Sequence, residues 1–275
     1  MSEQNEKKRS FQFKNFGDSL IIVSVIFVLF FSLLSSGCIN QVESKGSLVV
    51  EDMAGREVEV QKDPERVVAL GAGTLRLIDY INSTNIVVGV EEIEKDKKHL
   101  KGRPYIYAHP DLSNLPSIGP MHGGDPELIA SQTPDVIFWS DCTAGEANNL
   151  QEKTGIPVIA LKYGDLGAHR DKVYDGLQLL GEILGKEKRS DKVINYIKNT
   201  ISDLENRTQN LKSSERPTAY VGGVNYRGSH GISGTEPKFG PFQFLNARNP
   251  ASGLGMEHVM GSKEKIIEWD PDFIF

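Results

Sequence analysis

The sequence predicts an α/β protein of two lobes, each built on a mostly parallel sheet, with a long helical spine between them. Three observations support this fold class. Short apolar runs of strand length alternate with helical patterns, which is typical of βαβ units. A fourteen-residue unit occurs twice, at 125–138 and 262–275, and a long stretch without proline, 169–211, separates the two copies.

The two copies of the unit share six identical positions, among them a Glu near the start and a Pro-Asp pair before the final apolar run. Each copy indicates a short amphipathic helix, a turn at Pro-Asp that ends the helix, and a β-strand. We therefore expect one copy in each of two similar lobes. The alternative is that two independent turns share the same pattern.

Residues 1–47 are expected to form an export signal or anchor and a linker. A basic leader precedes an almost wholly apolar run, 20–34, and Ser35-Ser36-Gly37-Cys38 follows. A Cys after small residues resembles a lipoprotein lipobox, which would make Cys38 the lipidation site. An uncleaved anchor is the alternative, because 19–37 is close to spanning length. Both alternatives place the globular part on the outer face of the cytoplasmic membrane.

Composition limits the classes of function. The chain has 275 residues, of which 25% are charged and 39% hydrophobic, as in ordinary soluble domains. The net charge of −6 argues against a nucleic-acid partner, and we expect a monomer. If Cys38 carries lipid, Cys142 is the only other cysteine, so no intrachain disulfide is expected. Without a CxxC pair, a structural zinc or iron–sulfur site is not expected either.

The N-terminal lobe is predicted over 48–168. The sequence indicates a hairpin at 48–60, buried strands at 67–70, 86–90, 136–139 and 158–161, and helices from 75 and over 144–154. The segment 104–120 holds four prolines and is predicted as irregular loop. Parallel sheets bind ligands at the carboxyl ends of their strands. Those ends are expected at 71–74, 119–122, 139–141 and Tyr163.

The Gly-rich turn at 71–74 has two interpretations. A strand, a Gly-rich turn and a helix start can cradle a phosphate. The turn lacks the Lys-Ser/Thr of a P-loop and the third Gly of a dinucleotide fingerprint. We therefore favour a tight βα turn at the carboxyl edge of the sheet.

The helical spine is predicted over 169–214 and the C-terminal lobe over 215–275. Gly185 and the charged residues after it are a candidate break into two helices. A coiled coil is the alternative, but Gly181 and Gly185 interrupt the heptads. The C-terminal lobe begins with a strand at 218–222, and a Gly-rich loop, 223–234, and a helix at 242–247 follow.

These patterns together resemble the substrate-binding lipoproteins of ABC importers, in the class whose two α/β lobes are joined by one long helix. The resemblance covers 48–275 and rests on the lipobox, the repeated unit, the spine, Asp52-Met53-Ala54-Gly55-Arg56 and Arg66-Val67-Val68-Ala69-Leu70. It implies capture of an iron chelate (a siderophore complex or haem) or a corrinoid in the cleft between the lobes. It further implies delivery to an ABC permease with its ATPase subunits, without catalysis and without an intrinsic cofactor.

The resemblance also suggests roles for particular residues. In the family an exposed Glu on each lobe docks against arginines of the permease, and the matching positions are Glu127 and Glu264. Aromatic side chains stack on chelates, Arg pairs with carboxylate or catecholate oxygens, and Tyr or His can fill an open metal position. The ligand-binding candidates are His122, Trp139, Tyr163, Tyr226, Arg227, His230 and Arg248. The alternative role for Arg248 is to brace its own loop.

Other functions stay open at this point. Direct binding of a transition-metal ion would use His122 and His230, with Asp141 as an acid. A chelatase-like enzyme is less favoured, because the sequence holds no Gly-x-Ser-x-Gly elbow, HExxH or P-loop. A tethered sensor would look the same as a transporter component. Because 215–275 is much shorter than 48–168, we expect the second lobe to be truncated, with exposed sheet edges.

Overall fold

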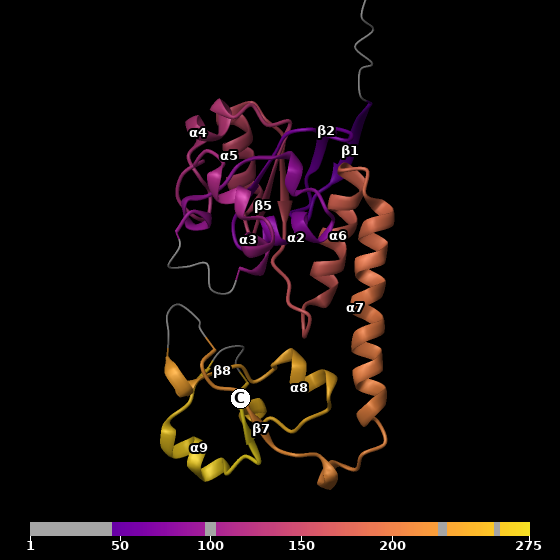
Figure 1. Cartoon of the computed structure of the whole chain (residues 1–275), viewed down its shortest axis with the longest axis vertical. Coiled ribbons are helices and arrows are strands. Elements are labelled where there is room, and N and C mark those ends of the chain that lie inside the picture. The colour runs from indigo at the N-terminus through magenta and orange to yellow at the C-terminus, as the bar shows by residue number, and fades with distance from the viewer. Residues whose placement is uncertain (1–45, 97–102, 225–229, 256–258) are drawn as a thin grey trace, which may run out of the picture. The chain divides into compact units, whose positions relative to one another are not determined.

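The computed structural model describes residues 46–96, 103–224, 230–255 and 259–275 (Figure 1). The predicted leader and Cys38 lie outside these ranges. Within them, no helix combines the length and the apolar character needed to cross a membrane.

A four-stranded parallel sheet organises the N-terminal part of the chain (Figure 1), which confirms the predicted fold class. Its strands run in the order β4-β3-β5-β6, and every pair is parallel. The strands are β3 (Val67–Leu70), β4 (Val87–Gly89), β5 (Val136–Ser140) and β6 (Val158–Leu161). Strands β3 and β6 are buried along their whole length, as continuous apolar runs in a parallel sheet require.

Helices cover both faces of this sheet. Successive strand residues point to opposite faces, so Val67 and Ala69 join the core cluster that includes α2 and α6, whereas Val68 and Leu70 join the cluster of α4 and α5. The helices are α2 (Thr74–Tyr80), α4 (Pro126–Ser131), α5 (Ala144–Thr154) and α6 (Arg170–Ile183). Both faces of the sheet are therefore filled, and its carboxyl edge stays available for a ligand.

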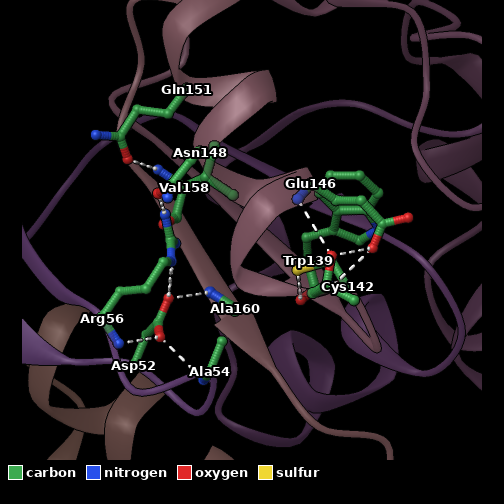
Figure 2. A network of polar contacts seen from close by, with 11 residues as sticks. Asp52, Ala54, Arg56, Trp139, Cys142, Glu146, Asn148, Gln151, Val158 and Ala160 are labelled. Atoms are coloured by element: carbon green, nitrogen blue, oxygen red, sulfur yellow. Dashed lines mark hydrogen bonds and ion pairs between the residues drawn. The ribbon is translucent and has the colours of Figure 1, made fainter.

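An antiparallel hairpin of β1 (Ser47–Glu51) and β2 (Glu57–Gln61) is attached to the sheet through Asp52 and Arg56 (Figure 2). The two side chains form an ion pair at 2.6 Å, and the carboxylate of Asp52 is fully buried. Asp52 also accepts the N–H of Ala160 in β6 at 3.0 Å. Arg56 donates to Asn148 of α5 at 2.7 Å and to the carbonyl of Val158. This motif of the sequence therefore connects hairpin, sheet and helix.

The segment 104–120 was predicted as irregular loop, and this prediction was wrong for its first part. Helix α3 (Pro104–Ala108) and a 3-10 helix (Pro110–Asn114) lie there. Proline is disfavoured inside helices but favoured at their first position, where no N–H is needed and φ is already suitable. Both helices begin with proline, so these residues start helices instead of breaking them.

The predicted spine consists of two helices that run side by side, α6 and α7 (Glu187–Thr208) (Figure 1). Gly185 separates them with a φ of 60°, in the left-handed region that favours glycine. The helices approach closely because Gly181 faces Ser190, where a Cβ on Gly181 would lie 2.8 Å from the Cβ of Ser190. The hydroxyl of Ser190 donates to the carbonyl of Leu177 at 2.7 Å.

The C-terminal part carries short strands and helices. Strand β7 (Ala219–Tyr220) pairs in parallel with β10 (Phe273–Ile274), and β8 (Gly234–Thr235) pairs antiparallel with β9 (Val259–Met260). Two helices complete it, α8 (Gly240–Phe244) and α9 (Lys263–Trp269). In the described ranges, the short 3-10 helices are Thr84–Ile86, Glu92–Glu94, Pro110–Asn114, Ser213–Glu215, Gly231–Ser233 and Pro250–Leu254.

The repeated unit has the same local structure in both copies, as predicted. The first copy forms α4 and then β5, and the second forms α9 and then β10. Asp125 caps α4 and Ser262 caps α9 through side-chain hydrogen bonds to backbone N–H groups. The two helices therefore begin in the same way relative to the repeated Glu.

Candidate ligand-binding site

The turn between β3 and α2 forms the base of the site at the carboxyl edge of the sheet. Gly71 and Gly73 have φ values of 79° and 78°. A Cβ on Gly71 would lie 2.8 Å from the carbonyl oxygen of Ser140. Thr74 donates its hydroxyl to the carbonyl of Leu70 at 2.7 Å. The chain thus makes the tight βα turn that was predicted, and α2 starts directly at the edge.

Glu91 joins this turn to a second loop. Its side chain is 4% exposed, and its Oε1 accepts N–H groups from Gly71 at 3.2 Å, His122 at 2.8 Å and Gly123 at 3.4 Å. Burial raises the pKa of the Glu91 carboxyl, although the three backbone hydrogen bonds and the charge of His122 act in the opposite direction. Glu91 therefore fixes two loops of the edge relative to each other.

Arg103, Glu94 and Tyr105 form a second polar group at the same edge. The hydroxyl of Tyr105 donates to Glu94 Oε1 at 2.9 Å, and Arg103 donates to the carbonyl of Ile93 at 2.7 Å. The Nε of Arg103 lies 3.9 Å from Glu94 Oε2. Burial raises the pKa of Glu94, and burial together with the charge of Glu94 raises the pKa of Tyr105 well above its usual range. Tyr105 therefore stays a neutral hydrogen-bond donor.

Arg76 on α2 is the cation of the site that is not committed to a carboxylate. Its guanidinium carbon lies 5.6 Å from the ring centre of Tyr163 and 5.9 Å from that of Tyr80. Its Nε is buried and has no hydrogen-bond partner within the described part of the chain. A guanidinium held between two aromatic rings with a free donor is suited to bind an anionic oxygen.

These groups surround one cavity of about 190 Å³. Its walls come from the β3–α2 turn, from α2, from the polar groups just described, and from the loops at Met121 and Tyr163. Asp141 accepts the N–H of Tyr163 at 2.9 Å, so the carboxylate of Asp141 positions the loop that carries this aromatic ring. The cavity combines two cations, a neutral phenol and an aromatic face with the carboxyl groups of Glu91 and Glu94.

The structure places the predicted ligand residues of the first lobe in different surroundings. Tyr163 lines the cavity. The side chain of His122 is exposed beside it, and only its backbone N–H contacts Glu91. Trp139 is half-buried and packs against the second core cluster, and its carbonyl accepts the thiol of Cys142 at 3.5 Å (Figure 2). Burial raises the pKa of that thiol to about 11.

Of the predicted ligand residues of the C-terminal part, Arg248 and His230 lie in the described ranges, and neither is among the residues that line this cavity. Arg248 forms a parallel bridge with Thr218 at the amino end of β7 and donates to the carbonyl of Arg216 at 2.9 Å, which is the bracing alternative. His230 is half-buried at the start of the 3-10 helix Gly231–Ser233. Tyr226 and Arg227 lie outside the described residues.

Sequence reasoning missed Arg76, Glu91, Glu94, Arg103 and Tyr105. A signal existed for Arg76, because it stands in the first turn of the helix that follows the Gly-rich turn. The other four had none, since acidic and basic residues on a charged surface segment have the same pattern as residues that meet at an edge.

A metal-ion site finds no support in the ranges that the structure describes. Within them, no group of three or more His, Cys, Asp or Glu side chains converges to hold a metal ion. His122, His230 and Asp141, the set considered from the sequence, do not form such a group there. In the described structure, the carboxylate of Asp141 accepts the N–H of Tyr163.

Glu127 and Glu264 occupy equivalent positions in two different helices. Each is the second residue of its helix, α4 or α9, and each is exposed. Hydrogen bonds from its own backbone N–H and from the side chain of Ser262 lower the pKa of Glu264. A Glu in the first turn also interacts favourably with the helix dipole.

These observations define a class of protein: an α/β solute-binding protein with a ligand edge on a parallel sheet and a helical pair after it. A family model described as "Periplasmic binding protein" matches residues 67–275, and the chain belongs to this family. Periplasmic binding proteins are the extracytoplasmic solute-binding components of ABC importers, and they work with a permease and an ATPase. They carry a ligand and not an intrinsic cofactor. The resemblance drawn from the sequence is thereby confirmed at the level of the family.

Three relatives illustrate the likeness. The molybdate-binding protein MolA of Haemophilus influenzae is 24% identical over 272 residues, covering 93% of this chain and 73% of MolA. The structure of molybdate-bound MolA superposes with a TM-score of 0.66 at 21% identity, covering 82% of this chain and 73% of that one. The petrobactin-binding protein YclQ of Bacillus subtilis has a TM-score of 0.62 at 20% identity, covering 84% and 77%. These structures show the fold that this chain shares.

The third relative is YvrC of Bacillus subtilis, an uncharacterized ABC transporter substrate-binding lipoprotein. It is 18% identical over 205 residues, and the match covers 70% of this chain and 61% of YvrC. The chain thus spans about three fifths of the length of this relative.

Proposed function

We propose that this chain captures an anionic metal chelate outside the cytoplasmic membrane and delivers it to the permease of an ABC importer. The observation that carries the proposal is Arg76, a guanidinium between two tyrosine rings with a buried Nε that has no partner in the described structure. Siderophore, haem and corrinoid ligands combine flat or aromatic surfaces with anionic oxygens, and Arg with Tyr recognises both features.

The size of the cavity suggests which part of a chelate enters it. At about 190 Å³ the cavity is smaller than a typical pocket for a whole drug-sized ligand, which is roughly 300–1,000 Å³. It suits one anionic arm of a chelate. We infer that the arm contacts Arg76 and that the remainder of the ligand lies against exposed side chains at the rim, among them Tyr163 and His122.

A small oxyanion is the second candidate, and two observations favour it. The cavity is small, and MolA, whose name states that it binds molybdate, aligns with 93% of this chain. A tetrahedral oxyanion would use the same donor, the Nε of Arg76. Both ligand classes are anionic metal species, so the charge of Arg76 serves either one.

The experiment is native mass spectrometry of the full chain with a ferric catecholate, haem, cobalamin and molybdate, followed by titration calorimetry of Arg76→Gln with the ligand that binds. We expect Arg76→Gln to weaken binding about ten- to a hundredfold, because a hydrogen bond to a charged group contributes about 1.5–3 kcal/mol. The matched control is Lys153→Gln on α5, an exposed cation away from the cavity. Unchanged affinity in Arg76→Gln would overturn the assignment of the site, and the absence of binding to every ligand would overturn the ligand class.

We further propose that Glu127 and Glu264 dock to basic residues of the permease and that Cys38 carries the lipid anchor. The first idea is supported by the exposure and equivalent placement of the two glutamates. The second is supported by the lipobox-like Ser35-Ser36-Gly37-Cys38 and by the likeness to the lipoprotein YvrC. Mass spectrometry of the N-terminal peptide tests the anchor, and an unmodified Cys38 would contradict it.

A further inference from the structure

A larger groove of about 660 Å³ lies beside the candidate site, between α2, the loop after β6 and α7. Helix α7 contributes one of its walls. The residues of that wall follow the spacing of a single helix face: Arg189, Lys192, Val193, Tyr196 and Ile197. The helix packs against α6 through its neighbouring face, where Ser190, Ile194 and Ile201 are buried. The packing of α6 against α7 therefore leaves this face of α7 free to line the groove.

Large apolar side chains are unusually exposed around this groove. The exposed fractions are 37% for Tyr80, 44% for Tyr163, 39% for Leu166 and 72% for Tyr196. Val173 and Val193 contribute aliphatic surface to the same groove. Aromatic and aliphatic groups that gather around one concave surface mark a binding site more often than scattered exposed residues do.

The charge of the groove is predominantly positive. Arg76, Arg189 and Lys192 line it, and the acid beside them is Asp165. The Oδ1 of Asp165 already accepts the N–H groups of Gly167 at 2.6 Å and His169 at 3.3 Å. Arg189 donates its Nε to the carbonyl of Tyr80 at 2.8 Å, which holds its guanidinium at the groove. The occupant that complements these charges is an anion.

We propose that this groove is a second binding site, for an aryl carboxylate. Its volume falls within the range of about 300–1,000 Å³ that is typical of small-molecule sites. Tyrosine rings favour an aromatic body, because offset and edge-to-face ring contacts add to the burial of apolar surface. Lysine and arginine side chains pair with the carboxylate through charge-assisted hydrogen bonds. The site lies beyond the proposed chelate cavity, although Arg76 and Tyr163 line both.

Substitutions at Lys192 and Tyr196 distinguish the two sites experimentally, because both residues line the groove and neither lines the chelate cavity. Both are exposed on α7, so their substitution leaves the core intact. The matched control is Lys198→Glu, which makes the same charge change at an exposed position of the same helix that does not line the groove. The probe is 2-naphthoate, and the neutral 2-naphthylmethanol has a similar aromatic body without the charge.

The test is titration calorimetry of the full chain with both probes at low ionic strength. We expect 2-naphthoate to bind at least about tenfold more tightly than the alcohol, since one charge-assisted hydrogen bond contributes about 1.5 kcal/mol or more. Lys192→Glu should weaken 2-naphthoate about tenfold or more for the same reason. Tyr196→Ser should weaken it about two- to tenfold through loss of a ring contact. Lys198→Glu should bind like the unchanged chain.

Three results would overturn the proposal. The first is no binding of 2-naphthoate. The second is equal binding of acid and alcohol, because the cations would then play no part. The third is an equal loss in Lys198→Glu and Lys192→Glu, which would indicate a general attraction to the cationic helix. Chelate binding by Lys192→Glu is measured in parallel, so failure of this site and failure of the proposed function give different results.

Discussion

Glu91 and Arg76 determine the candidate site at the scale of single residues, and they do so in different ways. Glu91 is buried and accepts three backbone N–H groups, so its carboxyl holds two loops of the edge together. Arg76 keeps a buried donor without a partner in the described structure, so it can bind one. We therefore expect substitution of Glu91 to change the stability of the fold and substitution of Arg76 to change the affinity for the ligand.

Glu91→Gln tests the role of the buried carboxyl through the pH dependence of unfolding. Burial raises the folded-state pKa of Glu91, so the folded protein holds a proton that the unfolded chain has already lost. The stability contributed by this group is therefore fully present below the unfolded pKa, about 4.3, and declines as pH rises through the folded pKa. Gln keeps the Oε1 acceptor but does not titrate. Urea unfolding from about pH 4 to pH 7 should show the variant gaining stability relative to the unchanged chain.

Glu146→Gln is the control, because its relative stability should change with pH in the direction opposite to that of Glu91→Gln. Glu146 accepts the backbone N–H and the hydroxyl of Thr143, both at 2.8 Å, in the capping box of α5. These hydrogen bonds lower the pKa of Glu146, so its contribution is present above the unfolded pKa and is lost as pH falls. The variant should therefore lose stability relative to the unchanged chain as pH rises. Parallel pH profiles for the two variants would contradict this account.

At the scale of elements, tight turns decide where the helices and loops of the site begin. The turn after β3 brings α2 to the carboxyl edge, and the turn between β1 and β2 carries the Asp52–Arg56 pair that attaches the hairpin to β6. Both turns contain glycine in the left-handed region, Gly71 with a φ of 79° and Gly55 with a φ of 77°. The two glycines have nearly the same φ but different neighbours.

Gly55→Ala and Gly71→Ala form a matched pair that separates strain from crowding. No atom lies within 4 Å of a Cβ built on Gly55, whereas a Cβ on Gly71 would lie 2.8 Å from the carbonyl oxygen of Ser140. We expect Gly55→Ala to cost about 1–2 kcal/mol of unfolding free energy from the left-handed conformation alone. Gly71→Ala should cost clearly more and should weaken ligand binding. Equal losses of unfolding free energy in the two variants, measured with urea, would show that the backbone at Ser140 moves away from the added methyl group without cost.

At the scale of the whole molecule, the repeated unit places one exposed glutamate on a helix of the N-terminal part and one on a helix of the C-terminal part. Two acidic points on one chain can orient it on a basic partner and speed their encounter. The docking role proposed above would account for the Glu at the same helix position in both copies of the unit.

Reversing both charges, Glu127→Arg with Glu264→Arg, should impair transport and leave ligand affinity unchanged. We expect the transport rate in proteoliposomes with the permease and ATPase to fall roughly tenfold or more, because like charges now face each other. Glu152→Arg, an exposed reversal on α5, is the control. Normal transport by the double variant would remove the docking role, and a loss of ligand affinity would indicate a folding defect.

The sequence alone was sufficient for the architecture, because strand and helix patterns are local. The apolar runs at 67–70 and 158–161 became fully buried parallel strands, and the repeated unit became a helix followed by a strand in both copies. It was insufficient for 104–120, where four prolines predict an irregular loop but two of them start helices. A proline in the first turn and a proline in a loop look the same without the neighbouring structure.

By itself, the sequence determined the class of fold and the βα turn at 71–74, since periodicity and glycine placement are properties of short segments. The family entered through the resemblance of its motifs to those of known binding proteins. Only the tertiary structure decided which side chains meet at the carboxyl edge. Glu91 reaches Gly71 and His122, and Arg76 reaches Tyr163, because a parallel sheet brings separate strand ends to one edge. Arg248, by contrast, braces the amino end of β7. The charge of a side chain follows from its residue type, but its partners depend on contacts between distant segments.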